Sequence, residues 1–319
     1  MPVFRKAMLL FNPVSGAHLK ARTATIGRIA DIFRRAGVEV LLEATRDRRS
    51  AGCQARAAID AGCDAVFACG GDGTVFDVLQ GVAETKAIMG VIPLGTGNVL
   101  AHDLGLAQRP ERSAAQLLAF IPHTISLAKI ESGGRSHFFT VAAGVGVHAE
   151  LIYRASAQAK QRGGYLAYYK NGARLLFRHI FVPFPIEITT SEGELIRTTA
   201  LEMVAMRVRS FGGPLRRWRP GSSLLSPDLR LVLLQNANRA HMLRYSLMAL
   251  AGIAPFEGLN SPHADLSVVS AKSVTCYPPD IRAAQLRVQA DGELLGPTPT
   301  HISIIPNALT LLMPSDAER

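Results

Sequence analysis

The sequence contains no hydrophobic run long enough to cross a lipid bilayer. The longest apolar stretch, Tyr245 to Phe256, has 12 residues and carries Gly252 and Pro255, whereas a membrane-spanning helix needs about 20. The first residues, Met1 to Lys6, also lack the apolar stretch and small-residue cleavage site of a signal peptide. These absences predict a cytoplasmic protein.

Cysteine is scarce, and no two cysteines form a CxxC pair. The four are Cys53, Cys63, Cys69 and Cys276. Cys53 and Cys63 fall in or beside an expected helix, and Cys69 ends an apolar segment. We therefore expect free, buried thiols in a reducing compartment.

Two familiar nucleotide-binding signatures are also missing. The sequence contains no GxxxxGK[ST] motif, which excludes an ordinary P-loop. No GxGxxG motif lies between the first expected strand and helix, which disfavours a dinucleotide-binding fold. Internal repeats and low-complexity segments are absent as well.

The charge balance is strongly basic, with a net charge of +10 and a pI of about 9.8. A basic surface attracts polyanions such as nucleic acid, nucleotide phosphates or anionic lipid headgroups. The sequence shows no zinc-ligand spacing, no aromatic RNA-binding signature and no tandem basic helix. We therefore expect no nucleic-acid partner.

The 319 residues, of which 48% are hydrophobic, suit two domains of ordinary size. In residues 1–125, short apolar segments alternate with segments of helical periodicity, two of which end at Gly37 and Gly62. This alternation predicts a parallel sheet flanked by helices. The expected strands cover residues 7–11, 38–43, 65–69 and 88–93, and the expected helices include residues 26–33, 50–61 and 75–83.

Residues 126–305 follow a different pattern. Many short β-like segments are separated by Gly, Pro and Asn, with one helical stretch at about residues 148–176. This pattern predicts an antiparallel β-sandwich. The expected strands cover residues 124–129, 136–142, 186–190, 201–206, 229–234, 266–269, 284–290 and 301–305.

Three glycine-containing loops follow expected strands of the first domain. They are Asn12-Pro-Val-Ser-Gly16, Gly70-Gly-Asp-Gly-Thr74 and Gly95-Thr-Gly-Asn98, and Asn98 is expected to cap the helix that follows it. Ligands bind outside the carboxyl ends of strands in open α/β sheets. Glycine lets backbone N–H groups approach a phosphate, and a helix start adds positive potential. Together the loops predict a nucleoside triphosphate site.

These loops and two later blocks resemble the diacylglycerol kinase and sphingosine kinase family. Cys69-Gly-Gly-Asp-Gly-Thr-Val-Phe-Asp77 resembles its GGDGT signature, and Asn12–Gly16 resembles its first nucleotide loop. Pro93-Leu-Gly-Thr-Gly-Asn-Val-Leu-Ala101 resembles its third loop. Gly144-Val-Gly-Val-His-Ala-Glu150 resembles the block that opens the second domain, and Asp291-Gly-Glu293 resembles its acidic DGE motif. The likeness to soluble bacterial diacylglycerol kinases spans nearly the whole chain.

The resemblance implies a fold and a reaction. The fold has an N-terminal α/β nucleotide-binding domain of the NAD kinase and diacylglycerol kinase type at residues 1–125, rejoined by residues 306–319, and a C-terminal antiparallel β-sandwich domain at residues 126–305. The reaction transfers the γ-phosphate of ATP, with Mg²⁺, to a lipid hydroxyl, most directly that of diacylglycerol. Phosphorylation of sphingosine, ceramide or another long-chain alcohol, NAD kinase activity, and a non-catalytic lipid- or nucleotide-binding role stay open as alternatives.

The resemblance also assigns roles to residues. Glu293 is expected to accept the proton of the lipid hydroxyl, with Asp291 beside it, and Asp72 to position Mg–ATP. By composition alone Asp291-Gly292-Glu293 is a hairpin-turn pattern, and a turn can also deliver Glu293 to a site. The expected nucleotide-binding residues are Asn12, Pro13, Ser15, Gly16, Thr45, Gly70, Gly71, Asp72, Gly73, Thr74, Val75, Phe76, Thr96, Gly97 and Asn98.

Three places depart from the family pattern. His148 stands where the family usually has an aspartate. The stretch that resembles Asp-Asp-Gly-Leu-Leu-Asp, which holds a structural Mg²⁺ in bacterial members, is Leu225–Arg230, with Ser226 at the central aspartate and Asp228 out of register. Met206–Gly213 lacks an asparagine that commonly precedes its Gly-Gly pair. The metal ligands and the lipid therefore stay unassigned.

A lipid kinase reaches its substrate from the membrane surface, so reversible, peripheral attachment to an anionic membrane is expected. The candidate contact is a cluster of arginines with two aromatic residues, for which a solvated loop is the alternative: Arg207, Arg209, Phe211, Arg216, Arg217, Trp218 and Arg219. Leu175–Phe184 is expected to be core or the entrance for an acyl chain. A homodimer is left open.

Overall fold

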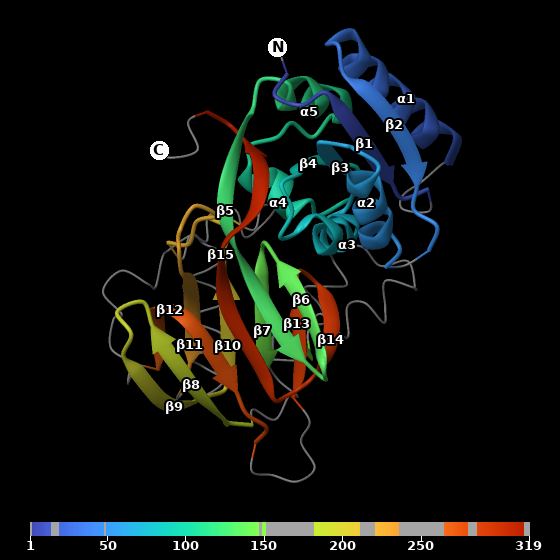
Figure 1. Ribbon diagram of the computed structural model, residues 1–319. Coiled ribbons are helices and arrows are strands. Elements are labelled where there is room, and N and C mark those ends of the chain that lie inside the picture. The colour runs from blue at the N-terminus through green and yellow to red at the C-terminus, as the bar shows by residue number, and fades with distance from the viewer. Residues whose placement is uncertain are drawn as a thin grey trace. The chain divides into compact units, whose positions relative to one another are not determined.

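The computed structural model describes residues 2–13, 19–47, 49–146, 149–150, 182–210, 221–235, 265–279 and 286–315 (Figure 1). The chain divides into two compact units. The first comprises Met1–Leu127, Phe211–Gly213 and Ile305–Arg319, and the second comprises Ala128–Ser210 and Pro214–Ile304. Two strands, β5 (Ile121–Ser132) and β15 (Thr300–Met313), contribute residues to each unit.

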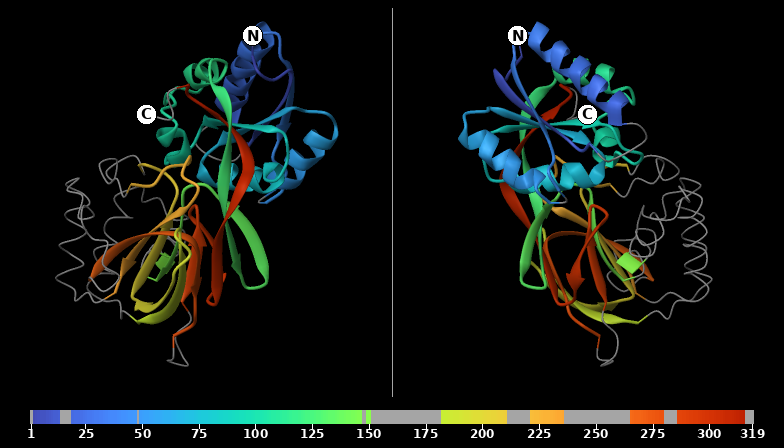
Figure 2. Two further views of the ribbon diagram at one scale, coloured as in Figure 1. Left: turned by 60° about the vertical axis from the view of Figure 1, so that its left-hand side comes forward. Right: turned by 90° about the vertical axis from the view of Figure 1, so that its right-hand side faces the viewer.

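The first unit contains a parallel sheet in the order β15–β4–β3–β1–β2. Its central strand β3 is buried at all six positions, as a parallel strand covered on both faces requires. Helices α1 and α5 lie on one face of the sheet, and α2 and α3 lie on the other (Figure 2). The strands are β1 (Lys6–Phe11), β2 (Glu39–Ala44), β3 (Ala65–Gly70) and β4 (Ile88–Pro93). The helices are α1 (Leu19–Arg35), α2 (Ala51–Asp60), α3 (Asp72–Val82), α4 (Val99–Asp103) and α5 (Pro110–Leu117).

This strand order has a switch point. From β1 the chain passes outward to β2 on one side, and β3 and then β4 follow on the other side. Open α/β sheets bind their ligands at such a switch point, outside the carboxyl ends of the strands, which here are β1 and β3. Asn12 follows β1 and Gly71 follows β3, so two of the glycine-containing loops begin at this point.

The second unit is built from antiparallel strand pairs. One path runs β14–β13–β7–β10–β11–β12, and β12 also pairs with β8 and with residues 300–303 of β15. Burial alternates along β8, as expected for a strand with one face on a core. The strands are β6 (Arg135–Phe139), β7 (Ala142–Gly146), β8 (Phe184–Thr190), β9 (Leu195–Ala200), β10 (Glu202–Met206), β11 (Leu229–Leu234), β12 (Leu266–Cys276), β13 (Arg287–Ala290) and β14 (Glu293–Pro297).

The predicted fold class, an α/β domain followed by a β-sandwich domain, is confirmed. Some local predictions were wrong. The segment at residues 136–142 is divided between β6 and β7, and β15 is one strand of 14 residues rather than a short one. Strands β9 and β14 were missed because their side chains are mostly exposed or half-buried, so their sequences lack a buried apolar face. The predicted helix at about 148–176 falls almost wholly outside the described residues.

All four cysteines are free thiols. Cys63, Cys69 and Cys276 are buried as predicted, but Cys53 is exposed on α2. Burial raises the pKa of the Cys69 and Cys276 thiols, which makes them poor nucleophiles. Within the described parts of the chain, no helix has both the length and the apolar character needed to cross a membrane.

Candidate active site

One arginine is hydrogen-bonded to both of the loops that follow β1 and β4. Arg22, on α1, donates from Nη1 to the carbonyl oxygen of Asn12 at 3.0 Å and from Nη2 to that of Leu94 at 2.9 Å. Partial burial lowers the pKa of its guanidinium. The planar fork of an arginine suits two acceptors at fixed separation. Arg22 was not predicted, because a basic residue on a helix gives no local signal of such contacts.

The loops after β3 and β4 meet through two glycines. A Cβ on Gly95 would lie 2.5 Å from the Cα of Gly71, and a Cβ on Gly71 would lie 3.3 Å from the Cα of Gly95. The Leu94 N–H also donates to the carbonyl oxygen of Gly70 at 2.9 Å. Glycine at these positions therefore permits a backbone-to-backbone contact between loops, in addition to the predicted approach of a phosphate.

Asp72 joins the same two loops. Its Oδ1 accepts the Val99 N–H at 2.7 Å and its Oδ2 accepts the Asn98 N–H at 2.9 Å. Burial raises the pKa of this carboxyl, and the two backbone N–H groups oppose that shift by stabilising the anion. A Cβ on Gly97 would lie 2.4 Å from Oδ2, so glycine is also needed there. Both carboxylate oxygens thus hold the start of α4.

The predicted cap of α4 was wrong. Asn98 occupies the N-cap position in the left-handed conformation, but its side chain makes no capping hydrogen bond. Its Nδ2 donates to the carbonyl oxygen of Gly95 at 2.8 Å, and its Oδ1 accepts the Gly95 N–H at 3.0 Å. The side chain of Asn98 therefore closes its own loop, and Asp72 supplies the acceptors for the helix start.

The other predicted nucleotide residues lie around these loops. The Thr45 N–H donates to the carbonyl oxygen of Phe11 at 2.9 Å, which places Thr45 beside the loop after β1. Thr96 is exposed. Gly73, Thr74, Val75 and Phe76 belong to the first turns of α3, and the last three are buried. Asn12 and Pro13 are half-buried at the end of β1, whereas Ser15 and Gly16 lie outside the described residues.

In the second unit, the DGE motif forms a two-residue hairpin turn. Ala290 of β13 pairs with Glu293 of β14, and the residues between them, Asp291 and Gly292, have φ angles of 47° and 84°. Two left-handed residues of the sequence Asp-Gly are typical of the tight turn that joins antiparallel strands. The Gly292 N–H donates to Oε1 of the buried Gln289 at 3.1 Å. The predicted hairpin is confirmed.

Asp291 holds this turn against the start of β7. Its Oδ1 accepts the N–H groups of Val141 and Ala142 at 2.9 and 3.0 Å, and its Oδ2 accepts the N–H and the hydroxyl of Thr140 at 2.9 and 3.2 Å. The Asp291 N–H donates to the carbonyl oxygen of Ala142 at 2.8 Å. The Asp291 carboxylate is therefore engaged by four donors, and half-buried Glu293 is the second carboxylate of the motif.

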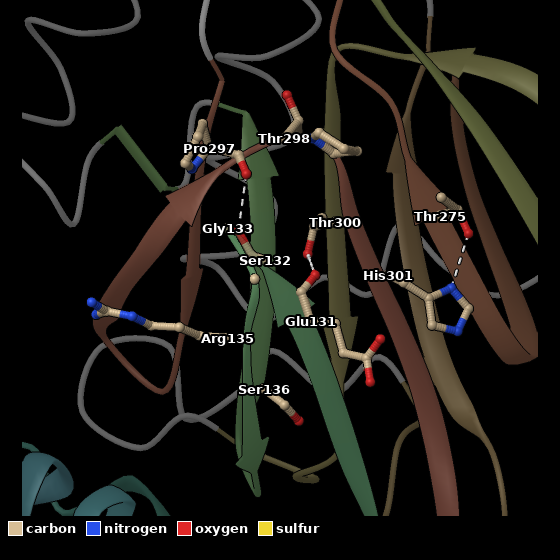
Figure 3. Close-up of a pocket in the computed structure, with 12 residues that line it drawn as sticks. Glu131, Ser132, Gly133, Arg135, Ser136, Thr275, Pro297, Thr298, Thr300 and His301 are labelled. Atoms are coloured by element: carbon tan, nitrogen blue, oxygen red, sulfur yellow. Dashed lines mark hydrogen bonds between the residues drawn. The ribbon is translucent and has the colours of Figure 1, made fainter.

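A cavity of about 600 Å³ lies elsewhere in the second unit, between the tip of the β5–β6 hairpin and residues 297–301 (Figure 3). None of the predicted site residues lines it. Its hydroxyl groups join neighbouring strands: Ser132 donates to the carbonyl oxygen of Pro297, and Thr300 donates to that of Glu131. The cavity is therefore distinct from the predicted nucleotide-binding and catalytic residues.

The remaining predictions concern metals and the membrane. The described residues contain no group of three or more His, Cys, Asp or Glu side chains that could hold a metal ion. Arg207 is 1% exposed, so its predicted place in a membrane-facing patch was wrong. Most of that patch, including Trp218, lies outside the described residues, as do His148 and residues 175–181.

Comparison with known proteins agrees with the two units. A family model described as the diacylglycerol kinase catalytic domain matches residues 6–130. A model described as the YegS C-terminal NAD kinase beta sandwich-like domain matches residues 140–313, which is more than half of the chain.

Individual relatives match over almost their full lengths. A diacylglycerol kinase of Bacillus subtilis (strain 168) is 27% identical, and the match covers 98% of this chain and 97% of that protein. A diacylglycerol kinase of Mycobacterium tuberculosis (strain ATCC 25618 / H37Rv) is 31% identical over 97% and 95%. The crystal structure of a diacylglycerol kinase from Bacillus anthracis str. Sterne shares the fold, with a TM-score of 0.72 at 20% identity over 99% of this chain and 100% of that one. The chain belongs to the diacylglycerol kinase family.

Proposed function

We propose that this protein transfers the γ-phosphate of Mg–ATP to the free hydroxyl of diacylglycerol and so makes phosphatidic acid. The observation that carries the proposal is the geometry of the DGE turn, in which four donors hold the Asp291 carboxylate and Glu293 follows two residues later, paired with Ala290. The match to diacylglycerol kinases over the whole chain supports the choice of substrate.

The nucleotide is assigned to the loops of the first unit. Arg22, Asp72 and the contact between Gly71 and Gly95 fix these loops before any ligand arrives. Preorganised backbone N–H groups stabilise phosphate charge without reorganisation during the reaction, and the start of α3 adds positive potential. Mg²⁺ arrives with ATP as part of the substrate and neutralises charge on the phosphates. Asp72 is then a positioning residue for the Mg–ATP site.

Proton removal is assigned to the second unit. A lipid hydroxyl is a weak nucleophile, and a placed carboxylate accepts its proton as the bond to phosphorus forms. Glu293 takes this role in the proposal, because Asp291 already accepts four hydrogen bonds. In-line placement of hydroxyl and phosphate supplies most of the remaining acceleration.

The proposed substrates also determine where the protein acts. ATP is available in the cytoplasm and diacylglycerol lies in the membrane, so the protein works at the cytoplasmic membrane surface. A net charge of +10 favours contact with anionic lipids. The sequence leaves a homodimer open, and light scattering of the purified protein measures the oligomeric state.

The test is transfer of labelled γ-phosphate from Mg–ATP to lipids in mixed micelles. The lipids are diacylglycerol, sphingosine, ceramide, monoacylglycerol and polyprenol, and NAD serves as a soluble acceptor. We expect diacylglycerol to be labelled, and Glu293→Gln to lower kcat about 10³-fold, because general-base catalysis contributes about 10²–10⁴-fold. Glu192→Gln removes a carboxylate from the exposed turn after β8 and serves as the matched control.

Other outcomes assign the function differently. Labelling of another lipid would correct the substrate while leaving the kinase assignment in place. Labelling of NAD alone would overturn the lipid-kinase proposal. Binding of ATP without transfer to any acceptor would favour the non-catalytic alternative.

A further inference from the structure

Arg207 is the largest fully buried side chain among the described residues. It directly follows β10, and its guanidinium is surrounded by backbone carbonyl groups of one loop. Nη1 donates to the carbonyl oxygens of Ser226 and Asp228 at 2.7 and 2.6 Å, and Nη2 donates to that of Leu224 at 2.9 Å. Three carbonyl dipoles therefore point their negative ends at one buried positive charge.

The Arg207 guanidinium keeps its positive charge although it is buried. Desolvation lowers the pKa of Arg207 to about 10, and the Asp228 carboxylate acts in the opposite direction. At neutral pH the guanidinium is still protonated. Asp228 itself accepts a hydrogen bond from the Ser191 hydroxyl at 2.8 Å. The loop thus contains a permanent internal cation, and a second contact, from the Ser222 hydroxyl to the carbonyl oxygen of Val208, holds it to the same segment.

Carbonyl oxygens converging on a cation are also how loops bind Mg²⁺ or Ca²⁺. The resemblance described above implies a structural Mg²⁺ in the stretch Leu225–Arg230. The residues present do not fit that ion. Ser226 supplies no carboxylate, and the carbonyl oxygens of Ser226 and Asp228 already accept hydrogen bonds from Arg207. Mg²⁺ demands near-octahedral oxygen ligands at about 2.0–2.1 Å, which cannot be met while the guanidinium occupies the centre.

The backbone of Arg207 is connected to the DGE turn by two successive hydrogen bonds. Its N–H donates to the carbonyl oxygen of Val141 at 2.9 Å, and the N–H of Val141 donates to Oδ1 of Asp291 at 2.9 Å. The strand before Arg207 also lies beside β7, because β10 and β7 are antiparallel neighbours in which Met206 is opposite Ala142. Arg207 therefore connects the 224–228 loop, through its side chain, with the residue that holds Asp291, through its backbone.

We propose that Arg207 is a built-in cation that takes the place of a bound metal ion in the 224–228 loop and positions the DGE turn. The role in catalysis rests on the proposed function of Glu293. Arg207 is a positioning residue, since it acts on Glu293 through Val141 and Asp291 and does not itself touch substrate.

The first test asks whether a metal holds the loop. The Tm of the full-length wild type is measured without ATP, in EDTA and then with added Mg²⁺ or Ca²⁺. We expect EDTA to shift Tm by less than about 2 °C, because the cation is covalently part of the chain. A fall of several degrees in EDTA that Mg²⁺ or Ca²⁺ reverses would overturn the proposal.

The second test separates charge from volume. Arg207→Met keeps a long side chain without charge, and Arg207→Lys keeps a charge as a single point. We expect Arg207→Met to lower kcat about ten-fold or more with KM for ATP changed less than about two-fold, and Arg207→Lys to retain more activity and stability than Arg207→Met. Arg197→Ala, on the exposed strand β9, is the control. Equal behaviour of the Lys and Met variants, or wild-type kcat in a folded Arg207→Met, contradicts the proposal.

A measurement that does not depend on catalytic activity tests the connection between Arg207 and the DGE turn. Hydrogen exchange of the amides of Thr140, Val141 and Ala142, which donate to Asp291, is compared between wild type and Arg207→Lys. We expect about ten-fold faster exchange in the variant, as local opening becomes easier. Unchanged exchange would overturn the positioning role even if the wild type proves to phosphorylate no lipid, so failure of this inference and failure of the proposed function are distinguishable.

Discussion

The regions around the GGDGT and DGE motifs are stabilised by the same kinds of hydrogen bond, but these bonds join different parts of the structure. In the first unit, the carboxylate of Asp72 accepts backbone N–H groups at the start of α4, and Arg22 donates to backbone carbonyl groups of two loops. In the second unit, Asp291 accepts backbone N–H groups at the start of β7, and Arg207 donates to three carbonyl groups of one loop. Each unit thus pairs an acidic side chain that binds N–H groups with an arginine that binds carbonyl oxygens.

The difference between the units lies in what these contacts fix. In the first unit they join loops that follow adjacent parallel strands, at an edge where Thr96 and Gly95 stay exposed. In the second unit they act on a hairpin turn and on a loop with a buried centre. Both aspartates therefore hold backbone segments in place. In the proposed function, the groups that react are the phosphates in the first region and Glu293 in the second.

The largest effect that would test this comparison is expected for Asp291→Asn. Its amide nitrogen would face N–H donors, so at least one donor would lose its acceptor, at a cost of about 1–3 kcal/mol in the free energy of unfolding. Displacement of Glu293 by about 1 Å is expected to lower kcat about 10²-fold. Urea unfolding and steady-state kinetics measure the two effects. A stable variant with wild-type kcat would show that the turn needs no help from Asp291.

A smaller effect, confined to the nucleotide, is expected for Gly95→Ala. The added Cβ would lie 2.5 Å from the backbone of Gly71, so the two loops must separate. We expect KM for ATP to rise about ten-fold, equivalent to about 1.4 kcal/mol, with the fold retained.

Gly27→Ala is the matched control for that substitution. No atom lies within 4 Å of a Cβ placed on Gly27, which is in the middle of α1. Alanine there is expected to stabilise the protein by about 0.5–1 kcal/mol and to leave KM unchanged. If Gly95→Ala and Gly27→Ala gave equal KM values, the loop contact would have no part in nucleotide binding.

The smallest effect concerns the pH dependence of stability. The pKa of Asp72 in the folded protein is raised above the ordinary value of 3.8, so the folded state binds this proton more readily than the unfolded chain. The stability that Asp72 contributes is therefore fully present below the unfolded pKa and is lost as pH rises through the folded pKa. The difference in unfolding free energy between wild type and Asp72→Asn should shift in favour of wild type as pH falls from 7 toward about 4. An opposite slope would mean that the N–H groups outweigh burial.

Local sequence signals predicted a large part of this structure. Alternating apolar and helical segments predicted the parallel sheet, and the buried run Ala65–Gly70 became its central strand. Asp291-Gly292 predicted a tight turn, because few residue pairs tolerate two consecutive left-handed conformations. The motif order predicted the family. Each of these signals is carried by residues within a few positions of one another.

Contacts between distant residues were decided only by the tertiary structure. Asp72 and Val99 are 27 positions apart, and Asp291 and Val141 are 150 apart. The sequence alone therefore assigned the cap of α4 to Asn98, the nearest suitable side chain, and placed Arg207 on a charged surface. A hydrogen-bonding side chain chooses its partner by proximity in space and by the cost of leaving a buried group unpaired. Local patterns in the sequence were enough to predict most of the helices and strands, the DGE turn and the family, but not strands β9 and β14. The fold decided which side chains hold the loops in place, because only packing brings their partners within about 3 Å.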